Sequence, residues 1–152
     1  IGVFHARNDI AILMDGDLEV DIGNIPTLIK NYEKGKTDVL VGIRWEKSSL
    51  TFEINTLGNY LINYIFNILY QSNLHDVLCC VKILEINLFK SLNILSSGFS
   101  IEVETMAKLV LRDLKIEEVK IRYKRRTANE GKKLKLSDSW DIIYKMFTLR
   151  FL

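Results

Sequence analysis

The stretch that decides the fold is I-A-I-L-M-D-G-D-L-E, residues 10–19. Its first five residues form a continuous apolar run, which is typical of a β-strand covered on both faces. Three carboxylates follow at alternate positions, Asp15, Asp17 and Glu19, and would project to one side of an extended segment. Two carboxylates about 5 Å apart repel by roughly 3 kcal/mol at an effective dielectric constant of about 20. Protons, nearby basic side chains or a divalent cation must therefore offset this repulsion.

The residues that follow predict a helix and a second buried strand. Asn24 is a candidate cap for a helix over residues 25–34, with a proline in the first turn and Gly35 just beyond the end. The run T-D-V-L-V-G-I, residues 37–43, then predicts a buried strand that ends at Arg44. A strand, a helix and a strand at this spacing indicate a right-handed parallel crossover, and hence an α/β fold.

The rest of the chain also alternates between helical and strand patterns, and we expect one domain over residues 1–152. The pattern is helical over residues 51–72 and again after Ser100, and residues 115–123 alternate as a late strand. A last helix is expected to begin at a cap on Asp138. The apolar stripe of the helix over residues 51–72 consists of Leu57, Leu61, Ile65, Ile68 and Leu69.

Composition excludes several classes of protein. Hydrophobic residues make up 48% and charged residues 26%, which is ordinary for a globular protein. The net charge of +2 argues against a nucleic-acid binder. Cys79 and Cys80 are adjacent and the two histidines are far apart in sequence, so a zinc site is not expected. No apolar run reaches the roughly 18 residues of a transmembrane helix.

A basic segment complements the acidic one. It spans residues 124–135, follows a predicted strand and precedes a predicted helix, which suits the binding of phosphate oxygens. In open α/β sheets, ligands bind beyond the carboxyl ends of the strands, where the three carboxylates also fall. Together the two segments predict a divalent ion and a phosphorylated substrate. The alternatives are a solvated basic loop, and acids that only follow a strand or cap the next helix through Asp21 and Asn24.

Six blocks of the sequence, taken in order, resemble the family 2 glycosyltransferases. They are ILMDGDLE, TDVLVGIR, GN at 58–59, HDVLCCVK, GFSIEVE and EEVKIRYKRR…GKKLK. The branch with the greatest similarity is that of the dolichol-phosphate, or polyprenyl-phosphate, mannosyl- and glucosyltransferases. The resemblance implies a GT-A fold with a mostly parallel sheet flanked by helices, and an inverting hexosyltransferase at the cytoplasmic face of a membrane. It further implies a nucleotide-sugar donor, a Mg²⁺ or Mn²⁺ ion and a polyprenyl (dolichyl) phosphate acceptor.

The resemblance also implies roles for individual residues. Asp15 and Asp17 match the D-x-D motif that holds the metal and the donor diphosphate, and Glu19 is an additional candidate metal ligand. Arg44 matches an arginine that faces phosphate, and Asp76 matches the aspartate that stands ahead of a Cys-Gly pair in the family. The candidate catalytic residues are Asp17, Arg44 and Asp76. The matches that clamp phosphates in the basic segment are Arg126 and Lys133.

The family begins with a strand–turn–strand half that binds the nucleotide base. This sequence does not contain that half, so we expect an N-terminally truncated domain.

The chemistry of the acceptor separates the remaining alternatives. A phosphate acceptor is already an anionic nucleophile, so it needs positioning by cations more than a general base. A sugar-hydroxyl acceptor would need a base, for which Asp76 is the candidate and His75 a weaker one. A third alternative is a non-catalytic module that binds a metal or an anionic lipid.

Two further features are open from sequence alone. The helix around residues 59–70 either packs on the sheet or turns an apolar side outward, to help hold an isoprenoid chain at a membrane surface. Glu102 and Glu104 are either carboxylates of the acceptor site or acids in a first helical turn.

Overall fold

The computed structural model describes residues 2–44, 54–124 and 136–152. In these residues a four-stranded sheet is flanked by helices, which confirms the α/β class. The strands are β1 (Ile10–Leu13), β2 (Val39–Ile43), β3 (Lys82–Glu85) and β4 (Ile116–Lys120). The helices are α1 (Gly2–His5), α2 (Ile25–Lys34), α3 (Ile54–Tyr70), α4 (Ile86–Ser91), α5 (Ser100–Leu111) and α6 (Leu136–Phe151), and a 3₁₀ turn covers Ile22–Asn24.

The sheet is mixed rather than mostly parallel. Its order is β1-β3-β2-β4, and β3 runs antiparallel to both of its neighbours, whereas β2 and β4 are parallel. The strands β1 and β2 are therefore parallel to each other, as predicted, but β3 is inserted between them. The expectation of a mostly parallel sheet was wrong because the sequence analysis identified no strand over K-I-L-E, which starts and ends with a charged residue.

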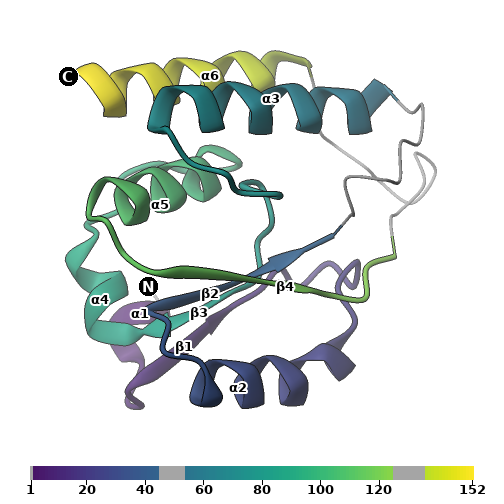
Figure 1. Ribbon diagram of the computed structural model, residues 1–152, viewed down its shortest axis with the longest axis vertical. Coiled ribbons are helices and arrows are strands. Elements are labelled where there is room, and N and C mark those ends of the chain that lie inside the picture. Colours follow the sequence, from purple (N-terminus) through teal and green to yellow (C-terminus); the bar gives the residue numbers. More distant parts are fainter. Residues whose placement is uncertain (1, 45–53, 125–135) are drawn as a thin grey trace.

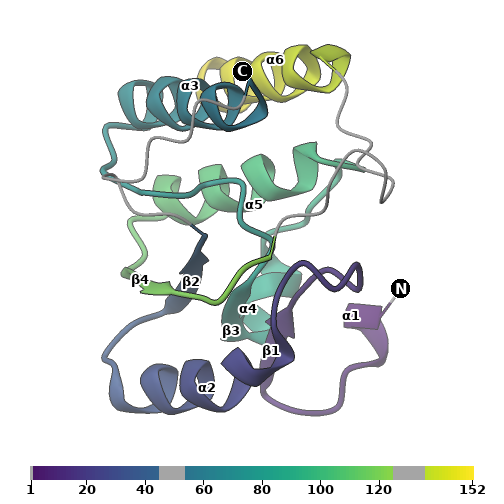
Figure 2. The same ribbon diagram turned by 90° about the vertical axis from the view of Figure 1, so that its right-hand side faces the viewer.

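Helices cover both faces of the sheet in layers (Figures 1 and 2). On one face lies α2, which buries Leu28 against a cluster that includes Leu40, Ile83 and Ile121. On the other face lies α5, and α3 and α6 run side by side in a further layer above it (Figures 1 and 2). A larger apolar cluster fills that side of the molecule, with Phe66, Met106 and Met146 among its fully buried members.

Helix α3 turns part of the predicted apolar stripe outward. Leu57, Leu61 and Ile68 are exposed, whereas Ile65 and Leu69 pack against the core beside the buried Ile62 and Phe66. The sequence left the buried side of this helix open because α3 contains no charged residue, so apolar residues occur on all of its sides. The inward face packs on α6 and α5 rather than directly on the sheet.

Most of the predicted elements occur at or near their predicted positions. Helix α2 has the predicted bounds, and β1 and β2 lie within the predicted strands. Helix α6 begins at Leu136, two residues before the predicted cap at Asp138. The antiparallel pairing of β1 with β3 continues one residue further, where the carbonyl of Asp9 accepts a hydrogen bond of 2.7 Å from the backbone N–H of Ile86.

Candidate functional site

The acidic segment that follows β1 is bent, not extended. Leu18 has a φ of +66°, in the left-handed region that bulky side chains rarely adopt. The bend brings the backbone N–H of Glu19 to Asp17, which accepts the hydrogen bond at 3.1 Å. The carboxylate of Glu19 instead accepts a hydrogen bond of 2.6 Å from the hydroxyl of Tyr123. The expectation of three carboxylates on one side of an extended segment was therefore wrong, because the chain bends at Leu18.

The bent acidic segment lies against the chain that leaves β4. Val20 and Tyr123 form an isolated antiparallel bridge. On either side of it the backbone N–H of Lys124 donates to the carbonyl of Glu19 at 2.8 Å, and that of Asp21 donates to Arg122 at 3.2 Å. The beginning of the basic segment, at Lys124, is thus held beside the acids. Arg126 and Lys133 lie outside the described residues.

Arg44 and Asp76 form a buried ion pair at the end of β2. Asp76 Oδ2 accepts from Arg44 Nε at 2.8 Å and from the Arg44 backbone at 3.1 Å, and Oδ1 accepts from Nη2 at 2.9 Å. The side chain of Asp76 is fully buried, and that of Arg44 is 14% exposed. Burial opposes the charge on Arg44, but the hydrogen bonds and the negative charge of Asp76 raise its pKa above the usual value. The structure thus brings together two of the predicted site residues.

Glu118, on β4, holds the turn that carries Asp76. Its Oε1 accepts from the backbone N–H groups of His75 at 2.7 Å and Asp76 at 3.3 Å. Its Oε2 lies 2.6 Å from Nδ1 of His75, so the imidazole is also tied to the sheet. Three contacts through one side chain fix the position of the turn, and with it the carboxylate that binds Arg44.

The two cysteines lie between the acidic segment and the ion pair. Gly42, on β2, allows a close approach of Val81, the residue after the cysteines, because a Cβ at Gly42 would lie 3.0 Å from Val81 Cβ. Hydrogen bonds with the Cys79 thiol and the Asp15 backbone lower the pKa of the Cys80 thiol, although its burial opposes the shift. Asp15, at the start of the acidic segment, is therefore in contact with the chain that follows Asp76.

The two glutamates of α5 serve different contacts. Glu102 pairs with the ammonium of Lys82, a fully buried residue of β3 that also donates to the carbonyl of Cys79 at 2.5 Å. Glu104 is 1% exposed and accepts hydrogen bonds from the backbone of Ser96 at 2.7 Å and from Lys108 Nζ at 2.5 Å. Each glutamate thus binds a residue outside α5, Lys82 or Ser96, and the sequence alone does not show these contacts.

The pKa of Glu104 predicts a pH dependence of folding. Burial raises it, but hydrogen bonds from Lys108, Ser96 and Leu95 prevail and lower it from 4.5 to about 2. Because the folded state holds the depressed pKa, the stabilisation is present above pH 4.5 and is lost as the pH falls towards 2. We expect a loss of about 3 kcal/mol over that interval from this group. Acid unfolding of Glu104→Gln, followed by circular dichroism, should lack this component, and a curve parallel to that of the unmodified protein would contradict the assignment.

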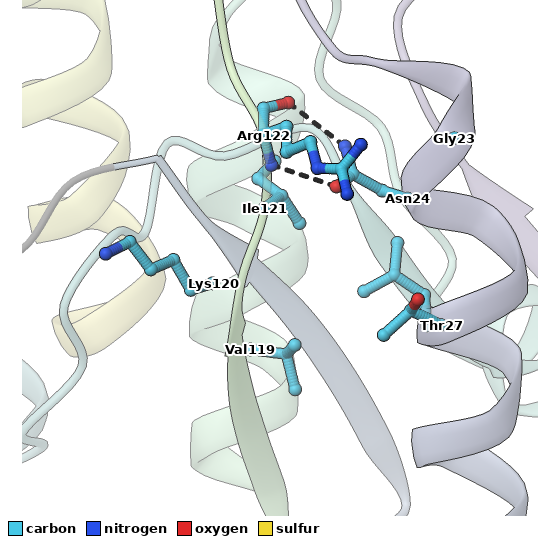
Figure 3. Close-up of a pocket in the computed structure, with 8 residues that line it drawn as sticks. Gly23, Asn24, Thr27, Val119, Lys120, Ile121 and Arg122 are labelled. Carbon is cyan, nitrogen blue, oxygen red and sulfur yellow. Dashed lines mark hydrogen bonds between the residues drawn. The ribbon is translucent and has the colours of Figure 1, made fainter.

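A cavity of about 280 Å³ lies between the start of α2 and the end of β4 (Figure 3). Asn24 was predicted to cap α2, but its side chain makes no cap hydrogen bond. Instead its amide bonds both the carbonyl and the N–H of Arg122, at 3.0 and 2.9 Å (Figure 3). None of the predicted site residues lines this cavity. Its lining consists of Gly23, Asn24, Thr27, Leu28, Val119, Lys120, Ile121 and Arg122.

The candidate ligands for a metal are the carboxylates near the end of β1. Among the described residues, no three histidine, cysteine or acidic side chains are grouped so that they could hold an ion by themselves. Carboxylate oxygens are the ligands that Mg²⁺ and Mn²⁺ prefer, and such ions are commonly held by one or two carboxylates together with substrate phosphates. Asp15 is exposed and Asp17 half-buried, so the pair fits an ion that arrives with a diphosphate.

Three residues of the site were missed by the sequence analysis: Tyr123, Glu118 and Lys82. Each acts through a contact with a residue far away in the chain, so no local pattern marks it. A hint exists for Lys82, because a lysine within an otherwise apolar run must find a partner if the run is buried.

The described part of the chain contains no helix that is both long and apolar enough to cross a membrane.

Curated relatives of the chain are sugar transferases. It is 29% identical over 94 residues to dodecaprenyl-phosphate galacturonate synthase of Rhizobium johnstonii, a match that covers 62% of this chain and 28% of the relative. It is 24% identical over 123 residues to the low-salt glycan biosynthesis hexosyltransferase Agl6 of Haloferax volcanii, covering 78% of this chain and 30% of that one. The chain thus spans less than a third of the length of these relatives.

Solved structures confirm the GT-A fold. Glucosyl-3-phosphoglycerate synthase of Mycobacterium tuberculosis, in complex with phosphoglyceric acid, superimposes with a TM-score of 0.73 at 14% identity. The similarity covers 98% of this chain and 52% of that one. The same enzyme with Mn²⁺, UDP-glucose and glycerol 3-phosphate gives a TM-score of 0.60 at 15% identity, with the same coverage of both chains. The family profile described as "Glycosyl transferase family 2" matches residues 1–92, and the chain therefore belongs to that family.

Proposed function

We propose that the protein transfers a sugar from a nucleotide-sugar donor to a polyprenyl phosphate, with inversion and with a divalent ion at the D-x-D motif. Membership of glycosyl transferase family 2 supports the reaction, and the relative named as a dodecaprenyl-phosphate galacturonate synthase supports the class of acceptor. The observation that carries the proposal is the buried Arg44–Asp76 pair beside the acidic segment, in which the carboxylate fixes the guanidinium at the end of β2.

Asp15 and Asp17 would hold Mg²⁺ or Mn²⁺ against the donor diphosphate, with Glu19 beside them. The ion, when bound, supplies positive charge that stabilises the nucleoside diphosphate as it leaves. The role of the chain is to fix the carboxylates, which it does through the Asp17–Glu19 and Glu19–Tyr123 hydrogen bonds. In the basic segment, Arg126 and Lys133 are proposed to add charge-assisted hydrogen bonds to phosphate oxygens.

The surroundings of Asp76 support a phosphate acceptor over a hydroxyl acceptor. A general base must present an oxygen to the proton that it removes. Both oxygens of Asp76 accept hydrogen bonds from Arg44, and the side chain is fully buried. An acceptor that is already anionic needs no such base, and the charge of Arg44 and of the basic segment would orient it. We propose Arg44 and Asp76 as a catalytic unit in which Asp76 positions Arg44.

An apolar surface on α3 and α6 supports a location at a membrane. The two helices run side by side in the outermost layer (Figures 1 and 2). Apolar bodies with polar tips, such as tyrosine and tryptophan, suit the interface between lipid and water. The exposed residues of this surface are Leu57, Leu61, Tyr64, Ile68, Trp140, Tyr144, Phe147 and Phe151. We propose that this surface rests on the cytoplasmic face of a membrane, where a polyprenyl phosphate is available.

The test of the transfer reaction is an assay with a panel of nucleotide sugars and a polyprenyl phosphate, using the protein expressed from its complete gene. We expect a glycosylated lipid phosphate with one nucleotide sugar of the panel, formed with Mg²⁺ or Mn²⁺ and lost with EDTA. A chain that binds metal or anionic lipid without any turnover across the panel would favour the non-catalytic alternative instead.

The membrane surface predicts binding to lipid vesicles. Leu61→Gln removes apolar area from the centre of the exposed stripe of α3. It should lower the affinity for phosphatidylglycerol vesicles, measured by co-sedimentation, about 3- to 10-fold, because roughly 1 kcal/mol of apolar burial is lost. Leu95→Gln makes the same change at an exposed leucine outside α3 and α6 and is the matched control. Equal binding of the two variants would show that the surface does not touch lipid.

A further inference from the structure

We infer that Tyr123 is a positioning residue that sets the geometry of the donor site, because its one side chain contacts both the acidic segment and Arg44. Its hydroxyl donates to Glu19 Oε2 at 2.6 Å, and its ring lies beneath the guanidinium of Arg44, 5.5 Å from ring centroid to Cζ. This inference rests on the proposed function, in which the two partners serve the metal and the phosphates of the donor.

Tyr123 is itself held in place by the sheet. It follows β4, which pairs with β2, and its backbone forms the bridge to Val20. The neighbouring hydrogen bond from Lys124 to the carbonyl of Glu19 keeps the two segments in register. The ring therefore occupies a defined position relative to β2 and to Arg44, the residue that directly follows this strand.

Glu19 lies on the bent segment, between Leu18, which has a left-handed backbone and is 80% exposed, and Val20, which is buried and forms the bridge to Tyr123. The bridge fixes the backbone of Glu19 beside Tyr123, and the hydroxyl of Tyr123 then holds the carboxylate in one orientation. A carboxylate has about four lone-pair sites, so this hydrogen bond is compatible with a bond to a metal.

Two substitutions distinguish the two contacts of Tyr123. Tyr123→Phe keeps the ring beneath Arg44 and removes the hydrogen bond to Glu19, whereas Tyr123→Leu removes both. Hydrogen-bond partners of metal ligands commonly change metal affinity by about 10- to 100-fold when they are lost. We therefore expect Tyr123→Phe to weaken Mn²⁺ binding about 10-fold, and Tyr123→Leu to raise the KM for the nucleotide sugar in addition.

The test is a titration with Mn²⁺ alone, followed by electron paramagnetic resonance of the free ion, on the protein expressed from its complete gene. Tyr70→Phe is the matched control, because Tyr70 also donates its hydroxyl, at 2.8 Å to the carbonyl of Met146, but in the core between α3 and α6. It should lower the midpoint of thermal unfolding and leave Mn²⁺ affinity unchanged. A merely structural role of Tyr123 would give the same result as this control.

The outcomes separate the inference from the function on which it rests. Mn²⁺ affinity that is reduced in Tyr123→Phe and unchanged in Tyr70→Phe supports the positioning role. Equal affinity of Tyr123→Phe and the unmodified protein would overturn that role and leave the proposed function standing. If the unmodified protein fails to bind Mn²⁺, the metal-dependent function and the positioning role are both overturned.

Discussion

Replacing Asp17 with asparagine is expected to abolish sugar transfer while the fold remains intact. The substitution removes a carboxylate from the D-x-D motif, and with it stabilisation of the leaving diphosphate worth several kcal/mol. At about 1.4 kcal/mol for each factor of ten, the rate should fall at least about 100-fold. The side chain of asparagine has nearly the same shape and can still accept the hydrogen bond from the backbone of Glu19. The bend and the stability should therefore be preserved, and removal of one acid should also relieve repulsion.

The measurement is the initial rate of transfer at saturating donor, with Mn²⁺ varied, alongside a thermal unfolding curve. Asp9→Asn is the matched control, since Asp9 is exposed and lies at the opposite end of β1. It should leave both quantities unchanged. Unchanged turnover of Asp17→Asn with added Mn²⁺ would end the assignment of the metal to this motif.

The second large effect is expected on stability, from Asp76→Ala. The substitution removes a fully buried carboxylate and leaves the guanidinium of Arg44, itself only 14% exposed, without its ion-pair partner. Breaking a buried pair in this way costs about 3–5 kcal/mol. Because Arg44 keeps some contact with solvent, we expect a value near the lower bound, which corresponds to about 6–12 °C in the midpoint of thermal unfolding. A shift of less than about 2 °C would show that the pair contributes little to the fold.

The acceptor class is tested by comparing Asp76→Asn with substitutions in the basic segment. If Arg126 and Lys133 clamp phosphate, each contributes roughly 1.5–3 kcal/mol, so Arg126→Ala or Lys133→Ala should slow transfer about 10- to 150-fold. Asp76→Asn should reduce the rate of transfer less than the basic substitutions do, once its lower stability is allowed for. The pH dependence of its rate should keep the same shape. A general base would instead make Asp76→Asn the crippling change and abolish the acidic limb of the profile. With mild basic substitutions, that result would identify a hydroxyl acceptor.

The elements predicted best are those that local patterns specify. Helix α2 has a proline in its first turn and an apolar spacing that needs no distant partner, and its bounds were predicted without error. The strand β3 was missed because its first residue is a lysine, which is buried in an ion pair with Glu102 on α5. Glu102 lies 20 positions further along the chain, and the pattern of residues within a strand cannot indicate so distant a partner.

The same distinction applies to the candidate site. The positions of Asp15, Asp17 and Arg44 at strand ends followed from the apolar runs that precede them. The pairing of Arg44 with Asp76, and the turn of Glu19 towards Tyr123, depend on side chains that are brought together from 32 and 104 positions apart. The inward face of α3 stayed open for a related reason, because only the neighbouring helix decides which apolar side is covered.

The most direct test of sugar transfer to a lipid phosphate is a comparison of two acceptors that differ by one group. A polyprenyl phosphate and the polyprenol of the same chain length should be offered in the same detergent with the donor that gives turnover. Product would be quantified by mass spectrometry. The proposed function predicts a glycosylated polyprenyl phosphate with release of one nucleoside diphosphate for each product, and a rate with polyprenol at least about 100-fold lower, because the alcohol needs a base that the buried Asp76 does not offer. Equal or faster transfer to polyprenol would contradict it.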